Sequence, residues 1–170
     1  MAGTLTVQNI EGPSSGSDAN TVIMGSGQKL IVPEHVIGSA TATYNTQQVI
    51  TSTSYATSGL EVSYTAKKST SKLLIRWDIP VELYDGGANT EVIGEFKLYK
   101  DSSAVGNAYV GITTMENVKR SGGNNAAAFY IDASDTSSHT YTCYVKTNAE
   151  QFTVFRYSLL GTLSVMEIAQ

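Results

Sequence analysis

The sequence predicts an all-β fold, an antiparallel β-sandwich or jelly roll, preceded by an extended N-terminal arm. The strongest sign is a strict alternation of apolar and polar residues over 73–83, typical of a strand with one buried and one solvated face. The apolar positions of that segment are Leu73, Ile75, Trp77, Ile79, Val81 and Leu83. The opposite face carries Arg76, Asp78, Pro80 and Glu82.

Composition is the second observation that favours an all-β fold. Charged residues make up only 15% of the chain, against about 25% in an ordinary soluble domain. Ser, Thr, Asn and Gly replace them, and Tyr outnumbers Phe by ten to four. Threonine and tyrosine suit the pleated, half-buried surface of a strand.

Regularly spaced turn signals are the third observation. Clusters of Gly, Asn, Asp and Ser at 85–87, 100–103, 121–125 and 132–138 predict turns between strands. The strands expected between them are 36–44, 47–52, 55–65, 72–84, 91–100, 105–114, 126–132 and 139–147, followed by one or two strands within 151–168. Short strands at this spacing are typical of a sandwich or jelly roll.

The chain ends in an apolar segment. Leu163, Val165 and Ile168 predict a final strand that lies either inside the sandwich or at a contact between subunits. Chain ends are usually polar and mobile unless they are packed. A central C-terminal strand or an oligomer would each explain the pattern.

Residues 1–34 differ from the head domain predicted for 35–170. Short apolar runs are separated by small residues, so the segment cannot bury a core by itself. We expect an anchoring arm that adds as a strand to a neighbouring molecule, with a flexible tail as the alternative. The residues expected to contact the partner are Leu5, Val7, Ile10, Val22 and Ile23.

Charge and targeting signals exclude several partners. The net charge is −4 and no basic stripe is present, so phosphate-driven binding of nucleic acid is not expected. No secretory signal or long apolar segment is found, so we expect synthesis in the cytoplasm and no membrane partner. The lone Cys143 excludes an internal disulfide and is predicted to be a buried hydrophobe.

No catalytic constellation is recognisable, and we expect no enzyme and no cofactor. His35 and His139 are far apart in sequence, and neither lies in a nucleophile motif. Asp132 and Asp135 could hold Ca²⁺ within one loop, although solvated turn acids are commoner, so no metal is predicted. Trp77 could stack on a sugar, but its place in the apolar series predicts a core residue.

Paired carboxylates, the requirement for glycoside hydrolysis, are not excluded by spacing alone. The candidates are Asp78, Glu82, Glu91 and Glu95. Their predicted positions on outward strand faces, next to Arg76 and Lys97, favour cross-strand ion pairs instead.

Two long segments carry a family resemblance. The arm MAGTLTVQNIEGPSSGSDANTVIMGSGQKL and the strand pair TSTSYATSGLEVSYTAKKSTSKLLIRWDIP resemble virion surface proteins of tailed bacteriophages, especially marine and cyanobacterial ones. The final SVMEI is also similar, whereas residues 84–150 show no matching motif. The resemblance implies a β-sandwich head, commonly a homotrimer, tethered to the virion surface by its arm. It brings no catalytic residues.

Two functional interpretations follow from this resemblance. In the first, the protein is a capsid decoration (cement) protein whose arm binds the major capsid protein or another virion protein. The absence of a shaft or adaptor domain favours this interpretation. In the second, it is a short fibre or receptor-binding tip whose loops at Asp85–Asn89, Ser121–Asn125 and Asp132–Ser138 contact a host surface glycan or protein. A carbohydrate-cleaving enzyme is a third, less favoured interpretation.

Overall fold

The computed structural model describes residues 33–84, 92–114, 120–148 and 151–170, except for the side chains of 108–110 and 112–114. The residues from Val32 onward form one compact unit. Nearly all of the predicted arm therefore lies outside the described residues, as does the predicted turn at 85–87.

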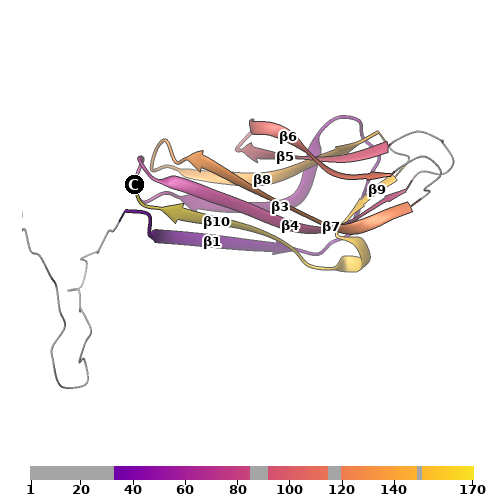
Figure 1. The fold of residues 1–170 in the computed structure, drawn as a ribbon, viewed down its shortest axis with the longest axis horizontal. Helices are drawn as coiled ribbons and strands as arrows, with labels where there is room; N and C mark the ends of the chain where they lie inside the picture. The colour runs from indigo at the N-terminus through magenta and orange to yellow at the C-terminus, as the bar shows by residue number, and fades with distance from the viewer. Residues whose placement is uncertain (1–32, 85–91, 115–119, 149–150) are drawn as a thin grey trace, which may run out of the picture. The chain divides into compact units, whose positions relative to one another are not determined.

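Two antiparallel sheets make up the described fold (Figure 1). Sheet A has β4 at its centre, paired along one edge with β7 and along the other with β10 and then β9, while β1 pairs with β10 and β2 with β9. Its strands are β1 (Val36–Tyr44), β2 (Gln48–Ile50), β4 (Lys72–Tyr84), β7 (Arg120–Asp132), β9 (Gln151–Val154) and β10 (Gly161–Ile168). Sheet B has the order β3-β8-β5-β6. Its strands are β3 (Ala56–Thr65), β5 (Val92–Lys100), β6 (Ser103–Thr114) and β8 (Ser138–Thr147).

The strand pairs are nested along the chain. Strand β5 pairs with β6, β4 with β7, β3 with β8, and β1 with β10. A long hairpin of eight strands wrapped into two sheets gives this order, which is the jelly roll. The predicted fold class is confirmed, with β2 and β9 as a short addition to sheet A.

Most predicted strands agree closely with the observed ones. Strands β1 and β4 have the predicted bounds, and the final stretch divides into β9 and β10 around a short 3-10 helix, η1 (Arg156–Ser158). One prediction was wrong: the turn expected at Ser121–Asn125 is the first half of β7, in continuous register with β4. No helix in the described part of the chain is long and apolar enough to cross a membrane.

The core lies between the sheets and is built as the alternation predicted. The six apolar residues of β4, Leu73 through Leu83 at every second position, are 0–2% exposed. Trp77 is fully buried, and its indole N–H donates to Asn125 Oδ1 at 2.8 Å. The Asn125 amide donates in turn to the Gly111 carbonyl at 3.1 Å, so this network joins β4 and β7 of sheet A to β6 of sheet B.

A central position explains the apolar C-terminal strand. Strand β10 lies between β1 and β4, and Leu163 and Val165 are fully buried as predicted. Ile168 instead belongs to the opposite, half-buried face of the strand. Because a single chain accounts for this burial, the C-terminus gives no argument for an oligomer.

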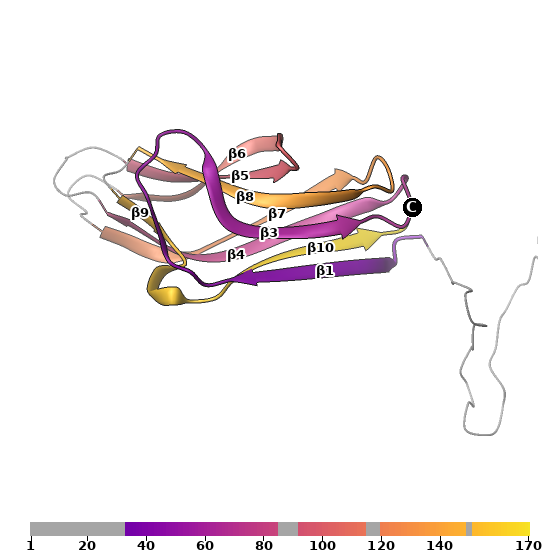
Figure 2. The same ribbon diagram turned by 180° about the vertical axis from the view of Figure 1, so that it is seen from behind.

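Glu167 is a charged residue in the inward-facing series of β10, fully buried. Its carboxylate accepts hydrogen bonds from the Tyr64 hydroxyl at 2.7 Å and from the backbone N–H groups of Lys67 and Lys68 at 2.8–3.0 Å. Desolvation alone would raise the pKa of this carboxyl, but these hydrogen bonds outweigh it and lower the pKa. The C-terminal strand thereby holds the β3–β4 turn, which lies beside the C-terminus in Figure 2.

Candidate functional site

The residues predicted to bind a partner through the arm lie outside the described residues. These are Leu5, Val7, Ile10, Val22 and Ile23. Of the three loops predicted to contact a host, Asp85–Asn89 also lies outside, and Ser121–Asn125 is strand rather than loop. Residues 133–137 do form a loop, between β7 and β8.

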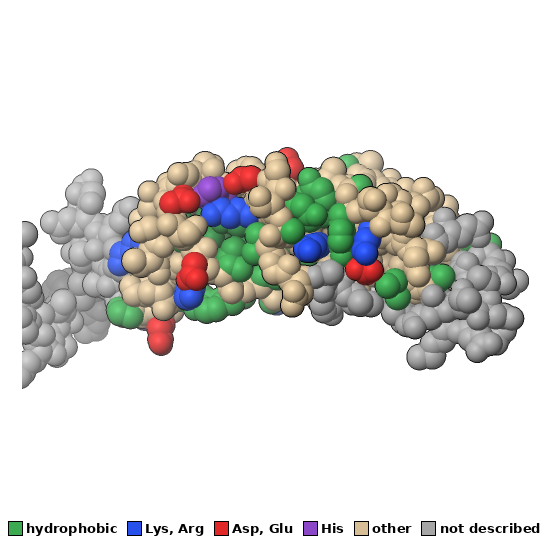
Figure 3. All heavy atoms as spheres, turned by 90° about the horizontal axis from the view of Figure 1, so that it is seen from above, with side chains coloured by type: hydrophobic (Ala, Val, Ile, Leu, Met, Phe, Trp, Pro, Cys, Tyr) green, Lys and Arg blue, Asp and Glu red, His purple; other side chains and the backbone are tan. Residues whose placement is uncertain are grey.

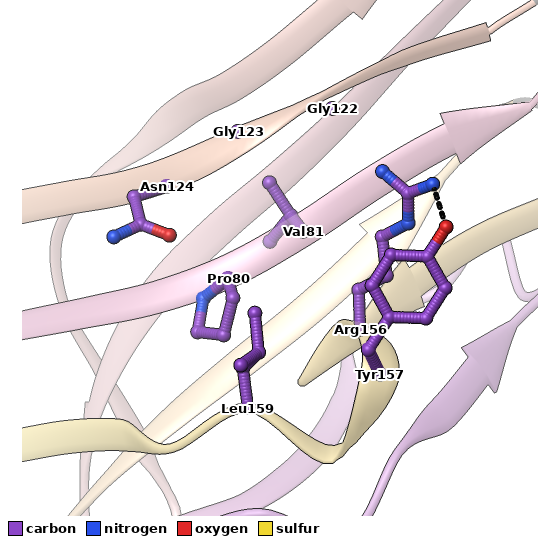
Figure 4. A pocket seen from close by; sticks show the side chains of 8 residues that line it. All are labelled: Pro80, Val81, Gly122, Gly123, Asn124, Arg156, Tyr157 and Leu159. Atoms are coloured by element: carbon purple, nitrogen blue, oxygen red, sulfur yellow. Dashed lines mark hydrogen bonds between the residues drawn. The ribbon is translucent and has the colours of Figure 1, made fainter.

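A shallow pocket of about 330 Å³ opens on the outer side of sheet A, where β4 and β7 meet the turn between β9 and β10 (Figure 4). It is lined by Pro80, Val81, Gly122, Gly123, Asn124, Arg156, Tyr157 and Leu159. Beside it, Tyr157, Leu159 and Leu160 are 71%, 54% and 58% exposed. Clustered apolar side chains next to a hollow are typical of a surface that binds another protein.

An unusual backbone conformation exposes these side chains. Phe155, Tyr157 and Ser158 have φ angles of 54–57°, in the left-handed region that non-glycine residues rarely occupy. Phe155 is fully buried against the Tyr44 ring, with centroids 4.9 Å apart. Gly161 leaves room for the Phe155 ring, because a Cβ at this position would lie only 2.4 Å from that ring. Burial of Phe155 therefore fixes the turn that presents Tyr157 to solvent.

Arg156, one of the residues that line the pocket, forms an ion pair. The Arg156 guanidinium lies 2.6 Å from the Glu82 carboxylate and 4.2 Å from the centroid of the Tyr157 ring. The guanidinium also donates a hydrogen bond to the Tyr157 hydroxyl (Figure 4). Gly122 leaves space for this guanidinium, since a Cβ there would lie 2.9 Å from it. Glu82 faces outward as predicted, but it is 9% exposed rather than solvated.

The outer face of sheet B carries a second group of interacting side chains, which we call the Tyr–Lys face. It comprises Tyr55, Glu95, Lys97, Tyr99, Tyr144 and Lys146, and Figure 3 shows hydrophobic and basic side chains gathered on this side of the molecule. The rings of Tyr99 and Tyr144 stack with centroids 3.9 Å apart. Lys97 and Lys146 lie 5.7 and 4.9 Å from the centroid of the Tyr55 ring, whose hydroxyl donates to Glu95.

His139 bridges two carboxylates at one end of sheet B. Its Nδ1 lies 2.8 Å from Asp101 and its Nε2 lies 3.0 Å from Asp135. The Asp101 hydrogen bond, followed by that of Asp135, raises the pKa of His139 despite partial burial. A backbone N–H from Ser137 and the His139 contact lower the pKa of Asp135 to about 2. The arrangement ties the β5–β6 turn to the β7–β8 loop.

The structure separates the residues considered for metal binding. Asp132 pairs with Lys72, whereas Asp135 pairs with His139. Within the described residues, no group of three or more His, Cys, Asp or Glu side chains is placed to hold a metal ion.

The candidates for catalysis are also kept apart. Cys143 is fully buried, and burial raises the pKa of its thiol. Asp78 and Glu82 are on β4 of sheet A, Glu95 is on β5 of sheet B beside Lys146, and Glu91 is not described. His35 is exposed and contacts the Pro33 carbonyl oxygen at 3.4 Å.

The described fold and surfaces define a jelly-roll protein whose exposed features are an apolar turn and an aromatic sheet face. No protein-family model matches the chain, and no curated protein matches it. Similar solved structures include dimeric latent PorU from Porphyromonas gingivalis, at 7% identity and a TM-score of 0.39, covering 85% of this chain and 14% of that one.

Two further similar structures come from infectious bursal disease virus. Its D431N mutant VP2 protein is 12% identical with a TM-score of 0.37, covering 92% of this chain and 44% of that one. A structure of the Gx strain is 12% identical with a TM-score of 0.39, covering 88% and 41%. The chain thus spans less than half the length of these proteins. Likenesses this distant define neither a family nor a function.

Proposed function

We propose that the protein is a structural protein of a bacteriophage virion, a capsid decoration protein that sits on the shell as a homotrimer. Residues 1–34 anchor it to the major capsid protein or to another virion protein, and the jelly roll forms the exposed head. The observation that supports this most is the eight-stranded jelly-roll order, an architecture typical of viral capsid and lectin domains. The resemblance of the arm and of the 51–80 segment to phage surface proteins points the same way.

The exposed turn of η1 supports a role in assembly. Tyr157, Leu159 and Leu160 are held out by a left-handed backbone that a buried Phe155 maintains. Because the left-handed backbone is unfavourable for these residues, its use to expose apolar side chains favours a protein contact over a purely solvated turn. We assign this turn as a contact of the head with its neighbours in the particle, secondary to the arm.

Deletion of the arm tests the proposal. A chain lacking residues 1–34 should keep the β-sheet circular dichroism spectrum and cooperative melting of the full chain, because the buried core of the described residues is built from residues between Ile50 and Val165. It should no longer co-sediment with purified capsids. In the full chain, Leu5→Ser and Val7→Ser should each weaken binding to capsids. The matched control Thr4→Ser should leave binding unchanged. Full binding by the truncated chain would contradict the anchoring role.

The Tyr–Lys face favours a second candidate, a fibre or receptor-binding tip that recognises a host surface glycan. Three tyrosine rings and two lysines on one sheet face offer apolar ring surface beside hydrogen-bond donors. A glycan array probed with the full chain and with Tyr144→Ala would test it. Binding that is lost in the variant would favour the receptor role, and an array with no bound glycan would count against it.

A further inference from the structure

The outer edge of β7 is the least protected sheet edge of the described fold. Strand β7 pairs over all thirteen residues with β4, without a register shift, and no described strand pairs with its other edge (Figure 1). Between Arg120 and Asp132 it contains no charged residue and no proline. Long, regular, uncharged edges are templates for pairing with another strand, and native proteins usually block them.

The other edge strands carry such protection. Register shifts interrupt β1 near Gly38, β3 between Thr57 and Glu61, and β6 opposite β5. The shortest, β2, has three residues. Bulges twist an edge away from a partner, and short edges give few hydrogen bonds. Strand β7 lacks both devices.

The inward-facing side chains of β7 are only partly covered by the rest of the head. Ala127, Phe129 and Ile131 pack against the core but are only partly buried. Beside them, Asn125 is 2% exposed because its amide reaches Gly111 of β6. A strand added along the edge of β7 would cover the three apolar side chains that remain half-exposed.

We propose that the occupant of this edge is β7 of a second copy, paired antiparallel about a two-fold axis through Ala126. In this register Arg120 lies opposite Asp132 of the other copy at both ends of the ladder. The Arg120 side chain is 58% exposed and the Asp132 side chain 71% exposed, although each already has a partner within the chain, Glu82 and Lys72. Opposite charges directly across an antiparallel pair stabilise it.

One small residue of β7 lies opposite a large one in the same register. Gly123 lies opposite Phe129 of the second copy, whereas the Arg156 guanidinium of the same chain already occupies the space beside Gly122. A Cβ at Gly123 would meet nothing within 4 Å, so the space beside it is open. Aromatic side chains across from edge glycines cover the exposed backbone. The strand is thus complementary to itself in the charges at its two ends, and at Gly123 it leaves open space opposite a large side chain.

The pairing joins sheet A of two heads into one continuous sheet. If heads are seated on a shell as trimers, a two-fold contact between heads of neighbouring trimers would link them laterally. Cross-linking between attachment points adds avidity to each anchor. The inference does not depend on the virion role, because it follows from β7 alone.

Cysteine cross-linking of the full chain tests both the contact and its register. In Ala126→Cys, the two substituted residues would lie directly opposite, about 5 Å apart at Cα, a distance that a disulfide can span. In the matched control Ala128→Cys, the two cysteines would lie four residues out of register, about 13 Å apart. Both positions are exposed, and the native Cys143 is buried.

Under mild oxidation we expect about tenfold more two-chain product from Ala126→Cys than from Ala128→Cys, as the distance limit on disulfides requires. Equal yields, no product, or a preference for Ala128→Cys would overturn the proposed pairing.

A second measurement avoids cysteine chemistry. Ala126→Lys would place like charges directly opposite on the two-fold axis, whereas Ala128→Lys would face Asn124. Analytical ultracentrifugation should give a larger mass for the unmodified chain than for Ala126→Lys, and Ala128→Lys should retain the larger mass. Identical masses for all three chains at every concentration would overturn the inference. Neither measurement uses phage particles, so its failure would leave the virion proposal standing.

Discussion

At the scale of single residues, Asn125 shows how a polar side chain organises the core. It accepts the indole N–H of Trp77 and donates to the Gly111 carbonyl, and it is almost fully buried. Unpartnered buried polar groups destabilise a fold more than the same bonds stabilise it. Asn125 therefore joins the two sheets where apolar packing alone would leave both groups unpaired.

Asn125→Ala should lower the free energy of unfolding by about 2–3 kcal/mol, because it leaves the buried Trp77 N–H and the half-buried Gly111 carbonyl without partners. Trp77→Ala should lower it by about 3–5 kcal/mol through loss of a buried aromatic side chain. Urea unfolding followed by circular dichroism measures both, and the exposed Asn124→Ala is the control. Wild-type stability of Asn125→Ala would show that the network is dispensable.

The His139 bridge predicts a pH dependence of stability. Its pKa is raised in the folded protein, so its contribution is fully present below the unfolded pKa, near 6.5, and is lost as the pH rises through the folded pKa. The free energy of unfolding should therefore fall as the pH rises above about 6.5, as measured by urea titration. His139→Gln should flatten this fall, and His35→Gln should not. An unchanged slope in His139→Gln would contradict the bridge.

At the scale of elements, β10 combines the central position in sheet A with a buried carboxylate. Strand β10 is the last described strand and lies between β1 and β4, and Glu167 reaches from it to the β3–β4 turn. The lowered pKa of Glu167 means that its contribution to stability is present above the unfolded pKa and is lost as the pH falls through the folded pKa.

Glu167→Gln should destabilise the fold by about 2–3 kcal/mol at pH 7. The amide has one acceptor oxygen instead of two, and its N–H₂ group would face backbone N–H donors. The variant should also lose less stability than the parent on acidification. Thermal melts from pH 3 to 7 measure both effects. Glu61→Gln, on the exposed face of β3, is the control and should change stability by less than about 0.5 kcal/mol.

The sequence predicts elements best where local pattern and tertiary burial agree. Strand β4 was predicted to its bounds because its alternation coincides with the buried face of sheet A. The first half of β7 was mistaken for a turn because Gly122, Gly123 and Asn124 favour turns locally. Pairing with β4 overrides that preference, since propensity on a strand depends on its neighbours.

The candidate surfaces were less predictable than the strands. His139 and Asp101 are 38 residues apart, and Tyr64 and Glu167 are 103 apart, so only the folded topology brings them together. The exposed turn at Tyr157 depends on the burial of Phe155, which no local motif announces. Trp77 and Cys143, by contrast, were predicted as core residues from alternation alone, and both are fully buried.

At the scale of the whole molecule, the head offers several candidate contact surfaces, and two of them share residues of β7. The η1 turn and its pocket adjoin sheet A, the Tyr–Lys face covers the outside of sheet B, and β7 presents an open edge. The proposed decoration role would use several of these surfaces. In the proposed assembly the arm attaches the protein to the shell, the η1 turn contacts neighbouring molecules, and the β7 edge pairs two heads.

The central claim, that this chain decorates a virion shell, is tested most directly by its copy number in purified phage particles. Quantitative protein staining against the major shell subunit should give a ratio near one chain per subunit. A ratio far lower would contradict decoration and favour a fibre or receptor-binding tip, and complete absence from the particles would contradict the virion role itself.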